Sequence, residues 1–234
     1  MANTNPLWGA PRIHGELIKL GIEISERTVT TIIRHRTKPP SQTWKTFLKN
    51  HMHQSTAIDF FTVPTLNFKV LFVLVILSHD RRRIIHFNAT FNPTAKWTAR
   101  QIVEAFPWDS APKYLLRDRD SIFGLYFQNQ VKAMGITEVI SAPKSPWQNP
   151  YVERVIGSIR RECLDHIIIL GRSHLITILT DYFDYYNNDR THYSLEKDTP
   201  GHRPVNQKPD RHSKVIAMPR VKGLHHRYEW KKAA

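Results

Sequence analysis

Cysteine is nearly absent from this sequence. Among 234 residues, Cys163 is alone. A single cysteine excludes an intrachain disulfide, so the fold does not rely on the crosslinks that stabilise small secreted domains. The first residues, Met1–Pro6, also lack the charged segment and following apolar stretch of a signal peptide. We therefore expect a protein of the reducing cytosol.

A hydrophobic run of membrane-spanning length is also missing. The longest apolar stretch is Val70–Leu77, whereas a transmembrane helix needs about 20 residues. Its β-branched residues instead predict a strand that is buried on both faces. We expect no membrane partner.

Acidic residues are scarce relative to basic ones. The chain has 20 Asp and Glu against 34 Lys and Arg, a formal net charge of +14. This charge favours a polyanionic partner, and nucleic acid is the first candidate. Residues 201–234 hold nine Lys or Arg and two acids. They predict a basic C-terminal tail, either a small module with a β-hairpin near Gly223 or a partly disordered arm.

The order of predicted elements indicates an α/β fold. Three strands are followed by a helix, a strand, a helix, a fifth strand and two more helices, which predicts a mixed five-stranded sheet flanked by helices. Residues 51–200 form this predicted core. Residues 1–38 predict two short helices, either part of a helix-turn-helix or a plain helical hairpin. The Pro-containing range 39–50 between them predicts a linker.

Three carboxylates are placed on these predicted elements in a pattern that suits metal binding. Asp59 lies in the first strand, Asp118 ends the fourth, and Glu153 stands 35 residues later at the start of a helix. Hard oxygen ligands of this kind hold Mg²⁺ or Mn²⁺, and such ions support in-line displacement at phosphorus. Each residue alone has a structural alternative, as a strand-edge charge, a turn residue or a helix N-terminal acid. Together, the three predict a metal site.

Several separated motifs accompany the carboxylates. They are Ile58-Asp59-Phe60, Arg117-Asp118-Arg119, Asn149–Arg154, Ile159–Glu162, Tyr186-Asn187 with Arg190–His192 and Leu195, and Thr199-Pro200. In this order they resemble the integrase core of bacterial insertion-sequence transposases, which is related to retroviral integrase and belongs to the DDE superfamily. The segment Trp8–Gly15 resembles the helix-turn-helix stretch that precedes this core.

The resemblance implies a ribonuclease-H-like fold with Asp59, Asp118 and Glu153 as catalytic residues and metal ligands. It implies Mg²⁺ (or Mn²⁺) as the cofactor and cleavage at transposon ends, with the freed 3′-hydroxyl joined to target DNA. The implied partners are double-stranded DNA, both transposon ends and target, and further copies of the chain in a homo-oligomer on DNA. The implied location is the bacterial cytosol, in association with the nucleoid.

Four basic residues are predicted to bind DNA: Arg154, Arg160, Arg161 and Lys144. Seven residues after Glu153, Arg160 returns to nearly the same helix face, beside the predicted metal site. Arg154 points about a third of a turn away. The alternative for these residues is a solvated basic helix face.

The chain departs from the family's pattern in two places. The family usually has Gly two residues after its second Asp, whereas this chain has Asp120. Asp120 is therefore an alternative ligand or a turn residue, and we favour Asp118 as the ligand.

The family also carries more sequence before Trp8, so we expect part of the end-recognition domain to be missing. The alternatives to a transposase are a non-catalytic DNA-binding remnant and a nuclease on the same fold.

Overall fold

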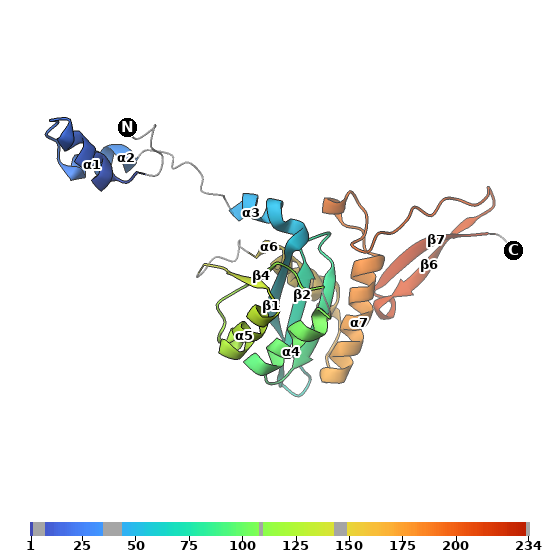
Figure 1. The fold of residues 1–234 in the computed structure, drawn as a ribbon. Coiled ribbons are helices and arrows are strands. Elements are labelled where there is room, and N and C mark those ends of the chain that lie inside the picture. Colours follow the sequence, from blue (N-terminus) through green and yellow to red (C-terminus); the bar gives the residue numbers. More distant parts are fainter. Residues whose placement is uncertain (2–7, 35–43, 108–109, 143–148, 233–234) are drawn as a thin grey trace. The chain divides into compact units, whose positions relative to one another are not determined.

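The computed structural model describes residues 1, 8–34, 44–107, 110–142 and 149–232 (Figure 1). The chain divides into two units, residues 1–49 and 50–234, which are considered separately. Lys144, one of the predicted DNA-binding residues, lies outside the described residues. Within the described part of the chain, no helix combines the length and the apolar character needed to cross a membrane.

The first unit contains the two predicted short helices, α1 (Ala10–Lys19) and α2 (Glu26–Arg34). They bury Ile13 and Val29. The chain leaves α1 through Gly21, whose φ of 73° is a left-handed conformation that glycine adopts without strain. The Ser25 hydroxyl accepts a hydrogen bond from the backbone N–H of Thr28 (3.2 Å) at the start of α2, as expected of an N-cap.

The range predicted as a linker, 39–50, differs from the structure in its second half. A helix, α3 (Trp44–His51), occupies this part. The rings of Trp44 and Phe47 stack with centroids 5.5 Å apart, and Leu48 is buried. Trp44 and Phe47 are half-buried, so the three side chains form an apolar face at helical spacing, which a linker prediction based on prolines overlooks.

The second unit is built on a mixed five-stranded sheet with the order β3-β2-β1-β4-β5. Its strands are β1 (Ser55–Pro64), β2 (Val70–Ser78), β3 (Ile84–Thr90), β4 (Tyr114–Arg117) and β5 (Thr137–Ile140). The pairs β1–β2 and β2–β3 are antiparallel, whereas β1–β4 and β4–β5 are parallel. The predicted sheet is therefore confirmed.

Helices α4 (Ala95–Ala105) and α5 (Leu125–Ala133) cover one face of the sheet (Figure 1). Their side chains pack on Ile58 of β1 and on Leu74 and Ile76 of β2, all fully buried. The N-cap of α4 is Thr94, whose hydroxyl accepts a hydrogen bond from the backbone N–H three residues later. This face is the main hydrophobic core.

The opposite face is covered by α6 (Pro150–Glu162) and α7 (Arg172–Asn188). Successive strand residues point to opposite faces, so Asp59 points away from the core that contains its neighbour Ile58. α6 contacts β1 and β2, and α7 contacts β3 through an edge-to-face pair of Phe87 and Phe183. Asp59 therefore faces the layer that holds α6.

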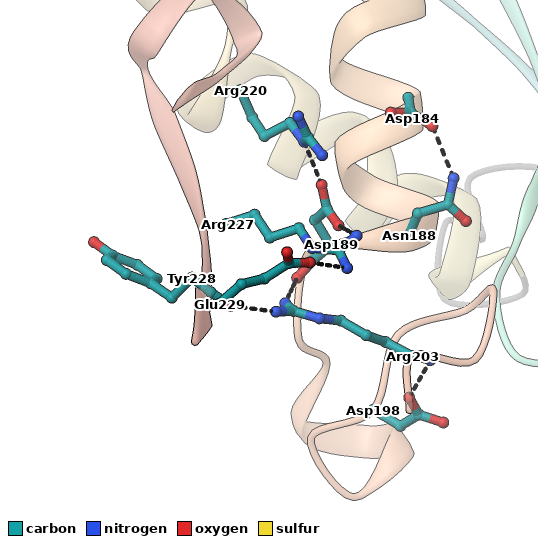
Figure 2. Close-up of polar contacts among 9 residues, drawn as sticks. All are labelled: Asp184, Asn188, Asp189, Asp198, Arg203, Arg220, Arg227, Tyr228 and Glu229. Carbon is teal, nitrogen blue, oxygen red and sulfur yellow. Dashed lines mark hydrogen bonds and ion pairs between the residues drawn. The ribbon is translucent and has the colours of Figure 1, made fainter. Parts of the chain in front are cut away.

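The C-terminal segment contains an antiparallel hairpin of β6 (Lys214–Arg220) and β7 (His225–Lys231). Figure 2 shows the Asp189 carboxylate, at the end of α7, between the guanidinium groups of Arg220 and Arg227. The Asp189 side chain is only 1% exposed, and its backbone carbonyl accepts a hydrogen bond from Arg203 (3.4 Å). This buried carboxylate fixes the hairpin to the end of α7.

Candidate active site

The register of two parallel strands places Asp59 beside Asp118. Ala57 of β1 pairs with Leu116 of β4. Asp59 and Asp118 each follow their paired residue by two positions, so the two carboxylates lie at the same level and on the same face of the sheet. Asp118 comes directly after the last residue of β4. The predicted neighbourhood of these two residues thus follows from strand pairing.

Helix α6 brings Glu153 into the neighbourhood of Asp59. Glu153 is in the first turn of α6, and its side chain is exposed. Seven residues further along, the Arg160 guanidinium donates to the carbonyl of Thr62 (3.2 Å), three residues beyond Asp59 on β1. α6 packs against β1, and the negative charge of Glu153 acts on Asp59. Glu153 therefore lies in the neighbourhood of Asp59.

The pKa of Asp59 is raised by its position in this cluster. Burial raises the pKa of Asp59 from its usual 3.8 to about 7, against the opposing hydrogen bond from the Phe60 backbone N–H (2.8 Å). The negative charges of Asp118, Glu153 and Asp120 contribute to this increase, in that order of size and less than burial does. A half-buried carboxylate surrounded by other carboxylates is a site where a cation is electrostatically favoured.

The donor chemistry of this cluster fits a hard divalent cation. Carboxylate oxygens are the ligands that Mg²⁺ and Mn²⁺ prefer, and a bound cation would relieve the repulsion felt by Asp59. Among the described side chains, however, no three His, Cys, Asp or Glu are close enough together to hold a metal ion as they stand. The carboxylates therefore suit a hard divalent cation by their chemical type and by their position around Asp59.

Asp120 is engaged in the turn that follows β4. Its carboxylate accepts hydrogen bonds from the backbone N–H of Ile122 (3.0 Å) and from the hydroxyl of Ser121 (3.3 Å). The bond to Ile122 makes Asp120 the N-cap of the short 3₁₀ helix η2 (Ser121–Phe123). Its own backbone N–H donates to the Asp118 carboxylate (3.1 Å). These contacts favour a turn role for Asp120.

Two sequence comparisons relate this arrangement to known proteins. Residues 134–200, which include Glu153, α6 and α7, match the family described as integrase core domain. A protein of insertion element IS476 from Xanthomonas euvesicatoria, an uncharacterized 39.2 kDa protein, is 22% identical over 169 residues; these cover 71% of this chain and 49% of the relative. The chain thus spans about half the length of the curated relative it matches.

Solved structures share the fold. The catalytic core domain of HTLV-2 integrase in complex with magnesium has a TM-score of 0.52 at 12% identity, covering 64% of this chain and 94% of that one. The catalytic domain of Mos1 mariner transposase also has a TM-score of 0.52 at 12% identity, covering 61% and 78%. The second unit of this chain shares its fold with these integrase and transposase catalytic domains. The ribonuclease-H-like fold predicted from the motifs is confirmed.

The three described arginines predicted to bind DNA are all exposed on α6. Arg160 is on the side of α6 that contacts β1, where it also lies over the Phe61 ring (5.6 Å). The Arg161 guanidinium lies close to Gly157 on the helix surface. Arg154 instead lines a pocket formed with α7. The structure therefore places Arg154 and Arg160 on different flanks of α6.

Arg190, in the motif that follows α7, connects the end of α6 to α7. Arg190 donates two hydrogen bonds to the Glu162 carboxylate (2.6 and 2.8 Å), and the Tyr182 hydroxyl donates a third (2.9 Å). Burial favours the protonated form, but the hydrogen bonds and charge of Arg190 outweigh it, so the pKa of Glu162 lies below its usual value. No helical or strand periodicity in the sequence signals this pairing across 28 residues.

Removing the charge of Asp59 is expected to stabilise the metal-free core at high pH. The folded-state pKa of Asp59 is above its usual value, so the folded protein keeps a proton that the unfolded chain releases. Ionisation of Asp59 therefore destabilises the fold increasingly as pH rises from about 4 to about 7. Each pKa unit corresponds to about 1.4 kcal/mol. Allowing for relaxation, we expect Asp59→Asn to be more stable than wild type by about 1–3 kcal/mol above pH 7.

This stability difference is measurable by urea unfolding in EDTA between pH 4 and 8. Asp165→Asn is the matched control, because Asp165 is an exposed carboxylate away from the cluster. The control should show no gain that grows with pH. A constant difference between Asp59→Asn and wild type across this range would contradict the raised pKa of Asp59.

Proposed function

We propose that this chain is a transposase or integrase that cuts and joins DNA with the help of Mg²⁺ or Mn²⁺. The observation that carries the proposal is that strand pairing sets Asp59 beside Asp118 on one face of the sheet, while the charge of Glu153, on the helix over that face, acts on Asp59. They come from two strands and a helix that belong to an integrase-type core. DNA strand transfer by direct transesterification is the reaction that best suits such a carboxylate cluster in a strongly basic protein.

In this proposal the protein's own contribution is to hold hard anionic oxygens in fixed positions. Asp59 and Asp118 are held by strand pairing, whereas Glu153 is held by the packing of α6 on β1 and β2. When bound there, divalent cations would activate the attacking oxygen and stabilise the leaving oxygen of an in-line displacement. The chain itself then needs no nucleophilic side chain and forms no covalent intermediate with DNA.

Known structures with the same fold support the choice of cofactor and partner. The HTLV-2 integrase core and a Mos1 transposase catalytic domain were both solved with magnesium. A chain of the simian T-cell lymphotropic virus intasome has a TM-score of 0.51 at 16% identity, covering 76% of this chain and 66% of that one. We infer that this chain also acts on double-stranded DNA, with its +14 charge attracting the phosphates, and as a homo-oligomer.

The proposal is tested by incubating the full chain with duplexes that carry the inverted repeats flanking its coding sequence. Nicked or joined products are expected with Mg²⁺ or Mn²⁺ and not with EDTA, because the reaction requires a cation at the carboxylates. Denaturing gels resolve the products. Duplex binding without any product in either metal would indicate the non-catalytic DNA-binding protein, and nicking without joining would indicate a nuclease.

A further inference from the structure

A cationic pocket lies on α6, on the flank that does not contact β1. Its volume is about 240 Å³. Arg154 on α6, Arg190 after α7 and Arg82 in the turn between β2 and β3 supply three guanidinium groups to its lining, together with Tyr151 and Tyr193. Glu153 is absent from this lining. The pocket is therefore distinct from the carboxylate cluster.

The turn between β2 and β3 adopts a strained backbone at the point that supplies Arg82. Arg81 and Arg82 have φ values of 49° and 57°, the left-handed region that Asn and Gly usually occupy in tight hairpins. Left-handed conformations of other residues cost about 1 kcal/mol or more each and persist where their side chains are needed. Arg81 donates to the Asp198 carboxylate (2.6 Å) and to nearby carbonyls, which anchors the turn. Arg82 points into the pocket.

Contacts with its neighbours fix the Arg82 side chain in the pocket. Its guanidinium lies over the Tyr151 ring (4.7 Å) and donates a hydrogen bond to the Ser194 hydroxyl. Tyr151 is in turn packed edge-to-face against His79 (5.1 Å). Burial, together with the charge of Arg82, lowers the pKa of His79 to about 4, so His79 is neutral near pH 7. The positive charge beside Tyr151 is therefore carried by Arg82, because His79 is neutral.

Two of the three arginines keep an uncompensated charge. Arg190 is neutralised by Glu162. Within the described part of the chain, neither Arg82 nor Arg154 forms an ion pair with an acidic side chain. Two guanidinium groups directed at one partly enclosed space repel each other unless an anion lies between them. The pocket is therefore electrostatically incomplete without an anionic ligand.

We propose that this pocket binds a phosphodiester group of the DNA strand, at a position other than the reacting phosphate. The proposal rests on the proposed function, which makes DNA the partner. Guanidinium groups offer planar pairs of donors that match phosphate oxygens. Tyr193, 93% exposed at the pocket, presents a flat apolar surface to the adjoining nucleotide. Because the helix between pocket and carboxylates is about 10 Å wide, the bound phosphate belongs to a neighbouring part of the strand.

The test measures DNA binding in EDTA, where the proposed cleavage cannot proceed. Fluorescence anisotropy of a labelled duplex is followed at several KCl concentrations for the wild-type chain, Arg82→Gln, Arg154→Gln and the double variant. Loss of one phosphate contact lowers the salt slope by about one and affinity by about tenfold near 0.1 M salt. We expect this loss in the double variant and part of it in each single variant. Arg83→Gln, an exposed arginine in the same turn, should stay within about twofold of wild type.

A further variant separates loss of binding from loss of folding. Arg82→Gly removes the guanidinium and also relieves the left-handed backbone, so its melting temperature should not fall by more than that of Arg82→Gln, while its affinity should fall equally. An unchanged salt slope in the double variant, an equal effect of Arg83→Gln, or no DNA binding by the wild-type chain would overturn the proposal. DNA binding through the pocket without metal-dependent products would instead overturn only the proposed function.

Discussion

Replacing Asp59, Asp118 or Glu153 by the corresponding amide is expected to reduce metal-dependent DNA cleavage and joining by roughly 10³-fold. A bound cation is worth several kcal/mol of transition-state stabilisation, and about 1.4 kcal/mol corresponds to a factor of ten in rate. An amide keeps the shape of each side chain but removes the anionic oxygen. DNA affinity in EDTA should not fall, because the substitutions remove only negative charge, which repels the phosphates.

Asp120→Asn is the matched control for this experiment. Asparagine retains the oxygen that caps η2, so the turn is preserved, and we expect a rate within about threefold of wild type. Single-turnover assays with a pre-nicked duplex measure the joining step for all four variants. Wild-type rates in the three amide variants would refute the proposed site. An inactive Asp120→Asn beside an active Asp118→Asn would move the ligand to Asp120.

The second large effect is expected for Asp189→Ala at the end of α7. This carboxylate is 1% exposed and pairs with two arginines of the C-terminal hairpin, each about a third exposed or less. Breaking one partner of a fully buried ion pair costs about 3–5 kcal/mol, so a loss of about 2–4 kcal/mol suits this partly exposed cluster. Urea unfolding measures the loss. Limited proteolysis should show faster cleavage between α7 and β6, because the hairpin detaches.

Asp184 on the same helix provides the control for Asp189. It is exposed and bonds to the Asn188 amide rather than to the hairpin (Figure 2). Asp184→Ala should cost no more than about 0.5 kcal/mol and leave the proteolysis pattern unchanged. Equal stability of the two variants would show that the ion pairs at Asp189 do not fix the hairpin.

Docking of the hairpin divides the basic tail into two groups of cations. Arg203, Arg220 and Arg227 bond to Asp189 and so contribute to folding. DNA binding by the tail, which its composition predicts, would then depend on cations outside this group. Those among the described residues are Lys208, Arg211, Lys214, Lys222, Lys231 and Lys232.

The sequence by itself determined the features that depend on local pattern. The apolar run Val70–Leu77 predicts a buried strand, and the interior of β2 from Val73 to Leu77 is fully buried. Strand and helix order predicted the mixed sheet because each element shows its own periodicity over a few neighbouring residues. The carboxylates were recognisable because Asp59 and Asp118 interrupt or end apolar runs. Their motifs also agree in order with those of a known family.

Only the tertiary structure decided which distant side chains meet. The side chains of Arg82 and Ser194 are 112 residues apart in the chain, and those of Arg190 and Glu162 are 28 apart, yet both pairs are hydrogen-bonded. Such contacts arise from the packing of α7 beside α6 and from the turn after β2. They leave no periodic trace in the sequence, because each partner has the same local pattern as an ordinary surface arginine or acid. The pocket on α6 and the anchoring of the hairpin were for this reason visible only in the fold.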